Sequence, residues 1–143
     1  MKVLQTLQTF HLQGIVEEKT LEGHSNYVDF LVKINESTIA SASWDQSIKI
    51  WDIITGDCLK TFEENSDEIT YKVKIKLVKI NGNTMASASY ATINIWDIIT
   101  GNGLKTLEGH LRSVFCLIKI NGNTIASGSY DTTIKLWNLF DKE

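Results

Sequence analysis

The chain has 143 residues, of which 43% are hydrophobic and 22% charged, and its formal net charge is −3. No apolar run approaches the roughly 18 residues that a membrane helix needs, and the N-terminus lacks the apolar core and the cleavage site of a secretory signal. Lysines are interspersed with acidic residues rather than gathered in a basic stripe, so neither a membrane nor a nucleic acid is expected as a partner.

The two cysteines, Cys58 and Cys116, are too few for a disulfide framework. Their small number favours a reducing compartment, and we expect a cytoplasmic location. Cys116 lies within the apolar run VFCLIKI, which predicts that it is a small buried residue.

The leader, residues 1–14, permits two interpretations. Its VLQTLQTF string is similar to later KTL strings and would then be the vestige of an earlier β unit. Its apolar residues would equally suit a short amphipathic helix. Residues 15–21 are predicted to form a strand, because KTLEGH here matches KTLEGH at Lys105–His110.

The first unit, approximately residues 15–60, continues with four short β-prone stretches. Apolar and other residues alternate over residues 28–34, as in a largely buried strand. TIASASW, SIKIWDI and CLKTFE follow it, and the connecting NES and TGD strings contain typical turn residues. Four strands with turns every eight to twelve residues predict an all-β fold.

The second unit, approximately residues 61–105, repeats this pattern with two departures. It has Glu64-Asn65 where the other units have Gly-His, and SYATI where they have SWDQS and SYDTT. Five extra residues also lengthen the β-prone segment 66–78. We interpret this segment as a long first strand or a bulge; the alternative is a distinctive recognition edge.

The third unit, approximately residues 106–143, ends shortly after its third predicted strand at Trp137. WDIITG begins at Trp51 and Trp96, and WNLF begins at Trp137, so the spacings are 45 and 41 residues. LEGH precedes the first and last of these tryptophans, with His24 and His110 each lying 27 residues before its Trp.

A period of about 40–45 residues, with Gly-His near its start and Trp-Asp near its end, is typical of propeller blades. From Lys19 to Leu139 the sequence therefore resembles the WD-repeat family of β-propellers. The resemblance implies three four-stranded antiparallel blades within residues 15–143.

The resemblance also implies a hydrogen-bonded chain of His, Ser, Asp and Trp in each blade. The matching positions are His24, Ser41, Asp45 and Trp51 in the first blade, Trp96 in the second, and His110, Ser127, Asp131 and Trp137 in the third. Ser43 and Ser129 compete with the two serines. Such a chain would satisfy polar groups that are costly to bury unpaired.

This constellation is not predicted to be catalytic. A catalytic triad is needed once, whereas the same residues occur in two blades, and no G-x-S-x-G elbow is present. The histidines also lack the spacing of metal ligands. We therefore expect no enzyme activity, no metal and no cofactor.

Three blades are fewer than the four to eight that close a propeller. In this family the N-terminal strand completes the last blade, so residues 15–21 of one copy are expected to complete the third blade of another. Homo-oligomerisation would then close the ring, and we favour six blades in a dimer. The alternative is a fragment or degenerate remnant of a longer propeller with only a structural role.

The resemblance further implies a protein-interaction scaffold that binds partner proteins or peptides on one face. Large aromatic residues precede the turn in every blade and are the main candidates for partner contacts. The candidate residues are Trp44, Tyr90 and Tyr130, with Tyr27 and Arg112 as secondary candidates.

Overall fold

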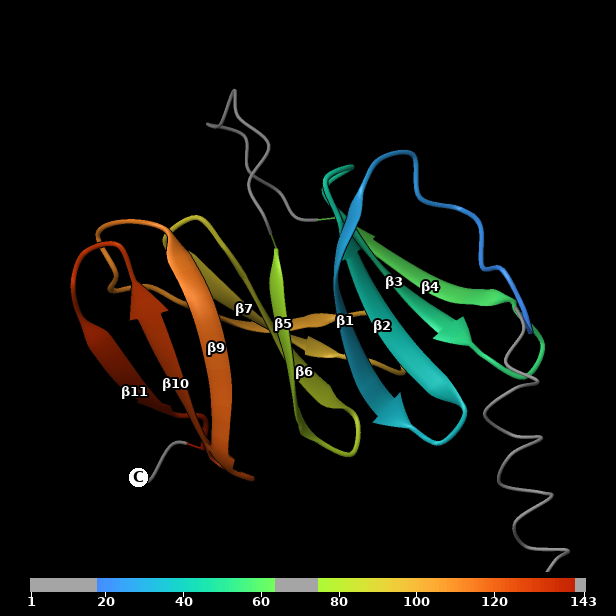
Figure 1. The fold of residues 1–143 in the computed structure, drawn as a ribbon. Helices are drawn as coiled ribbons and strands as arrows, with labels where there is room; N and C mark the ends of the chain where they lie inside the picture. The colour runs from blue at the N-terminus through green and yellow to red at the C-terminus, as the bar shows by residue number, and fades with distance from the viewer. Residues whose placement is uncertain (1–17, 64–74, 141–143) are drawn as a thin grey trace, which may run out of the picture.

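The computed structural model describes residues 18–63 and 75–140, which form an all-β array of three antiparallel sheets (Figure 1). The first blade consists of β1 (Val28–Asn35), β2 (Thr38–Ser43), β3 (Ser47–Asp52) and β4 (Cys58–Glu63). The second consists of β5 (Lys76–Asn81), β6 (Thr84–Ser89), β7 (Thr92–Asp97) and β8 (Gly103–Leu107). The third consists of β9 (Val114–Asn121), β10 (Thr124–Ser129) and β11 (Ile134–Asn138).

Consecutive strands pair within each blade, and the blades lie side by side through their first strands, β1, β5 and β9 (Figure 1). In the described ranges, no helix is long and apolar enough to cross a membrane.

The repeated WDIITG motif forms the turn between the third and fourth strands of a blade. Asp52 Oδ1 accepts hydrogen bonds from the backbone N–H groups of Ile54 and Thr55, at 2.8 and 3.1 Å. Gly56 then closes the turn with a φ of 85°, a left-handed conformation that glycine adopts without a steric penalty. The second blade repeats this arrangement around Asp97, so the Asp of this motif is a turn residue.

The core lies between the blades. One cluster joins the β2–β3 face of the first blade, including Ile48 and Ile50, to Leu77 and Met85 of the second. A second cluster joins the corresponding face of the second blade to the third, where Ile125 is fully buried. Each sheet is therefore apolar on both faces and depends on its neighbours for burial.

The two ends of the array expose faces that are covered elsewhere. Ile48 and Ile93 are 0% exposed beneath the next blade, whereas their equivalent in the third blade, Ile134, is 79% exposed. At the opposite end, Leu31 is 61% exposed, although its second-blade equivalent Leu77 is 2% exposed. The repeat thus places apolar residues on both terminal faces, where no blade within the described residues covers them.

One expectation is corrected by the structure. Cys116 is exposed rather than buried, because it lies on the uncovered face of the third blade. The third blade contains three strands of its own within the described residues, as expected. Residues 18–21 form no strand within one copy, and their pairing with the third blade of another copy stays a prediction. The predictions for residues 1–14 and for most of segment 66–78 fall outside the described ranges.

We predict that Ile93→Ala lowers the free energy of unfolding by about 2–5 kcal/mol, since it leaves a cavity between the second and third blades. Ile99→Ala, at an exposed turn position of the same blade, should change it by less than about 0.5 kcal/mol. Urea denaturation followed by tryptophan fluorescence measures both variants. Equal losses would contradict the placement of the core between the blades.

Candidate functional site

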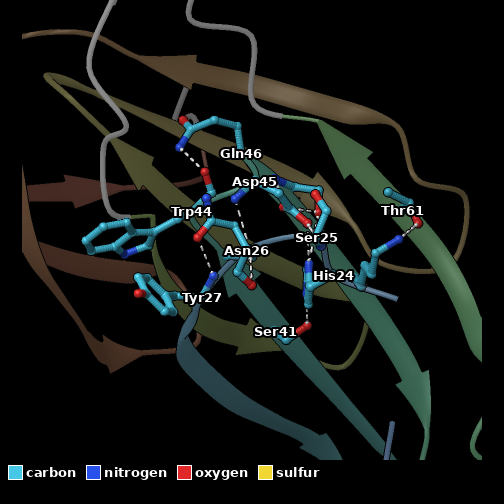
Figure 2. Close-up of polar contacts among 12 residues, drawn as sticks. His24, Ser25, Asn26, Tyr27, Ser41, Trp44, Asp45, Gln46 and Thr61 are labelled. Atoms are coloured by element: carbon cyan, nitrogen blue, oxygen red, sulfur yellow. Dashed lines mark hydrogen bonds and ion pairs between the residues drawn. The ribbon is translucent and has the colours of Figure 1, made fainter. Parts of the chain in front are cut away.

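The first blade contains the expected chain of polar side chains, of which Figure 2 shows His24, Ser41 and Asp45. His24 Nδ1 lies 2.9 Å from Asp45 Oδ2, and His24 Nε2 lies 2.6 Å from Ser41 Oγ. Trp51 Nε1 donates to the same hydroxyl oxygen at 2.8 Å. Because an ionised carboxylate only accepts, we assign the proton to Nδ1, and the Ser41 hydroxyl then donates to Nε2.

The third blade repeats this chain almost unchanged. His110 Nδ1 lies 2.8 Å from Asp131 Oδ2, and His110 Nε2 lies 2.6 Å from Ser127 Oγ. Trp137 Nε1 donates to Ser127 Oγ at 2.8 Å. The structure thus brings together all eight of the residues proposed for these two blades.

The assignment to Ser41 rather than Ser43 follows from strand register. Ser41 is paired with Lys49 across β2 and β3, which places it diagonally beside Trp51 on the same face. Ser43 lies one step further along the strand. Its hydroxyl accepts from the backbone N–H of Asp45 at 3.0 Å and donates to the carbonyl of Asn26 at 3.3 Å.

Asp45 also organises the turn before β3. Its Oδ1 accepts from the backbone N–H of Ser47 at 2.8 Å and from the Ser47 hydroxyl at 2.6 Å, and its Oδ2 accepts from the backbone N–H of Ser25 at 3.0 Å. Thr133 makes the corresponding contacts to Asp131. Ser47 and Thr133 were not among the predicted residues; the signal for them in the sequence is a hydroxyl residue two positions after each Asp.

These contacts hold the pKa of both carboxyl groups well below the usual range. At Asp45, burial raises the pKa, but the hydrogen bonds from Ser47, His24 and Ser25 together outweigh that effect. At Asp131, the hydroxyl of Thr133 makes the largest contribution to the lowered pKa. Both carboxylates therefore act as fixed acceptors at neutral pH.

The second blade contains only the Trp–Ser part of this chain of polar side chains. Trp96 Nε1 donates to Ser87 Oγ at 2.8 Å, and the indole ring stacks on Phe62 of the first blade with centroids 5.3 Å apart. In the shortened turn, Tyr90 takes a φ of 56°, a left-handed conformation that is uncommon for a residue other than glycine.

The candidate partner-contact residues Tyr27 and Trp44 lie together in the first blade (Figure 2). Their rings are 5.1 Å apart in an edge-to-face arrangement, and Trp44 N donates to Tyr27 O at 2.8 Å. Trp44 Nε1 also donates to Asp29 Oδ2 at 3.2 Å. Asp29 was not among the predicted site residues, because the alternating pattern of β1 does not indicate which side chain would bond to it.

The other candidates lie in the second and third blades. Tyr130 is exposed and stacks on Phe115 with centroids 4.8 Å apart, a contact that sequence analysis did not foresee. Tyr90 is exposed, and its carbonyl accepts from the backbone N–H of Val114 at 2.6 Å. The backbone carbonyl of Arg112 accepts from the Ser129 hydroxyl at 3.0 Å.

We predict that Asp45→Asn reduces the pH dependence of stability in acid. A folded pKa below the unfolded value of about 3.9 stabilises the protein above that pH, and this contribution is lost as pH falls through the folded pKa. The variant should be about 1–2 kcal/mol less stable at pH 7, and its stability should fall less steeply from pH 5 to pH 2.

Urea denaturation at several pH values measures this effect, with Asp57→Asn at an exposed turn position as the control. Parallel stability curves for wild type and Asp45→Asn would contradict a role for the ionised carboxylate.

Two curated proteins share part of this sequence. A ribosome biogenesis protein WDR12 homologue from Anopheles gambiae is 41% identical over 46 residues, which are 32% of this chain and 11% of that protein. The small ribosomal subunit protein RACK1 from Schizosaccharomyces pombe is 38% identical over 48 residues, 33% of this chain and 15% of that protein. The chain therefore spans a small part of the length of either relative.

Solved structures match more of the fold. The structure of U3-55K and the crystal structure of the RRP9 WD40 repeats give TM-scores of 0.73 and 0.74, each at 27% identity. Each match covers 85% of this chain and 38% of the solved chain. The family described as WD domain, G-beta repeat matches residues 16–52 and 101–138, just over half of the sequence. The chain belongs to this WD-repeat family.

Proposed function

We propose that the chain is a non-catalytic scaffold that binds partner proteins or peptides through aromatic side chains on one face. The observation that carries this proposal is a large aromatic residue at the same position of every blade: Trp44, Tyr90 and Tyr130. The backbone at each position is bonded, to Tyr27, Val114 and Ser113 respectively. A backbone fixed in this way loses little conformational entropy when its side chain binds a partner.

The geometry of the polar chains supports a structural rather than a catalytic role. Ser41 is 2% exposed, and its hydroxyl is already bonded to both His24 and Trp51. A nucleophile must reach its substrate, whereas this oxygen is enclosed within the blade. Ser127 has the same surroundings in the third blade.

The names of two relatives favour a particular class of partner. One is a ribosome biogenesis protein and the other a small ribosomal subunit protein. We propose that the partner is a protein component of such a ribonucleoprotein particle. A reducing, cytoplasmic location is part of this proposal and is supported by the free, exposed thiols of Cys58 and Cys116.

A complete propeller would give the partner face more than three blades. We propose that copies of the chain associate to close a ring, with six blades in a dimer. The exposed apolar faces at the two ends of the array support this association.

We predict that the combination Trp44→Ala, Tyr90→Asn and Tyr130→Ala reduces partner capture at least about ten-fold, since such aromatic residues dominate binding energy. Asparagine is chosen at position 90 because it tolerates the left-handed φ. Quantitative mass spectrometry of affinity-purified complexes measures the loss.

The matched control replaces Ile54, Ile99 and Leu111 with alanine, which removes exposed apolar residues outside the aromatic positions. Circular dichroism melting verifies the fold of both triple variants. Unchanged capture by a folded aromatic variant would reject this face as the binding surface and favour a purely structural role.

A further inference from the structure

We infer that two copies of this chain join head to tail, with the third blade of one copy packing on the first blade of the other. In this contact, residues 19–21 of the second copy become a fourth strand beside β11 of the third blade. The inference rests on the proposed ring and assigns its contact surfaces.

Residues 19–21 already occupy the position that a preceding blade's outer strand would take. A Cβ atom placed on Gly101 would lie 3.7 Å from Phe62 Cδ1 and 3.9 Å from Lys60 Cδ, both in β4 of the preceding blade. A Cβ atom on the equivalent Gly56 would lie 3.7 Å from Leu21 Cδ2 and 3.3 Å from Lys19 Cδ. The KTL string therefore rests on the first blade as the KTF string of β4 rests on the second.

Residues 19–21 could pair as an outer strand with only one of the three described blades. In the complete blades the fourth strand pairs with the outer edge of the third strand, so residues 19–21 need a third strand whose outer edge is unpaired. In the part of the chain that the structure describes, β11 pairs with β10 alone, whereas β3 and β7 already pair with β4 and β8. The third blade of a second copy is thus the occupant that fits.

The two faces that would meet are equivalent to faces that already pack together. Ile48 and Ile50 of the first blade are buried beside Leu77 and Met85 of the second. Ile134 and Leu136 are their repeat equivalents in the third blade, and both are exposed. The exposed Leu31 is the equivalent of Leu77 on the face that would cover them.

A polar contact between the first and second blades indicates a matching polar contact between the two copies. Lys79 Nζ of the second blade donates to the backbone carbonyl of Ile34 in the first. Lys33 occupies the same KIN position as Lys79 and here pairs at the surface with Glu36, at 2.8 Å. In the proposed contact, Lys33 reaches the carbonyl of Ile120 in the third blade of the other copy.

The register of the donated strand follows from the complete blades. Lys49 pairs with Thr61 across β3 and β4, and Lys49 Nζ donates to Thr61 Oγ1 at 3.0 Å. Asn94 pairs with Thr106 across β7 and β8 in the same way. The equivalent pair between copies is Lys135 with Thr20.

Cysteine cross-linking tests this register directly. In a Cys58→Ser and Cys116→Ser background, we mix chains carrying Lys135→Cys with chains carrying Thr20→Cys under mild oxidation. Directly opposed cross-strand residues are close enough for a disulfide, so we expect a linked two-chain band on a non-reducing gel. The control replaces Thr20→Cys with Thr61→Cys, the same residue in a blade that is already complete.

The mass of the chain in solution tests the apolar part of the contact. Light scattering should give two chains, and Leu136→Lys should raise the dissociation constant about ten-fold or more, since a charge replaces a buried side chain. Leu136 is exposed in the single chain, so the variant should keep its melting temperature when dissociated. Leu111→Lys, at another exposed leucine, should leave the mass unchanged.

A one-chain mass for the wild type, or equal cross-linking by Thr20→Cys and Thr61→Cys, would overturn the inference. Partner capture is measured separately with the aromatic variants. Loss of the cross-link with retained aromatic-dependent capture would therefore reject the head-to-tail contact and leave the scaffold proposal standing.

Discussion

The fold depends on the burial of sheets that are apolar on both faces. Ile50 and Met85 come from neighbouring blades and meet in one cluster, and Ile95 and Ile125 do the same in the next. Burying such a side chain contributes about 1.5–3 kcal/mol, so stability accumulates at the contacts between blades. A single blade would expose both faces, which explains why the unit recurs along the chain.

Within a blade, the chains of polar side chains pair the polar atoms of buried rings. A tryptophan and a histidine carry polar atoms that must be paired when they are buried. In the first and third blades, one serine hydroxyl satisfies both rings, and an aspartate fixes the orientation of the imidazole. The second blade has neither the His nor the Asp, and its Trp96 is stabilised by Ser87 and by stacking on Phe62.

Features governed by local chemistry could be predicted from the sequence. Period-two alternation predicted the strands, and turn residues such as Asp52 and Gly56 marked their ends. The repeated His, Ser, Asp and Trp positions predicted the members of the polar chains. Ser41 and Ser43 could not be separated in this way, because alternation places both on one face and only the strand register distinguishes them.

Features governed by neighbouring blades were harder to predict. Cys116 lies in a strongly apolar run, yet it is exposed because burial depends on which sheet lies opposite. The stacking of Tyr130 on Phe115 depends on contact between two strands that the pattern of either strand does not specify. The position of Lys19 and Leu21 against Gly56 likewise depends on tertiary packing.

The outer edge of β11, which is unpaired within the described residues, has a consequence for handling the protein. An unpaired strand edge is a template for uncontrolled strand addition, and aggregation is its usual result. Along this edge, Lys135 lies between Ile134 and Leu136 and supplies the charge that discourages such addition. The charge of Lys135 therefore favours solubility, on the same short strand that the proposed contact between copies would use.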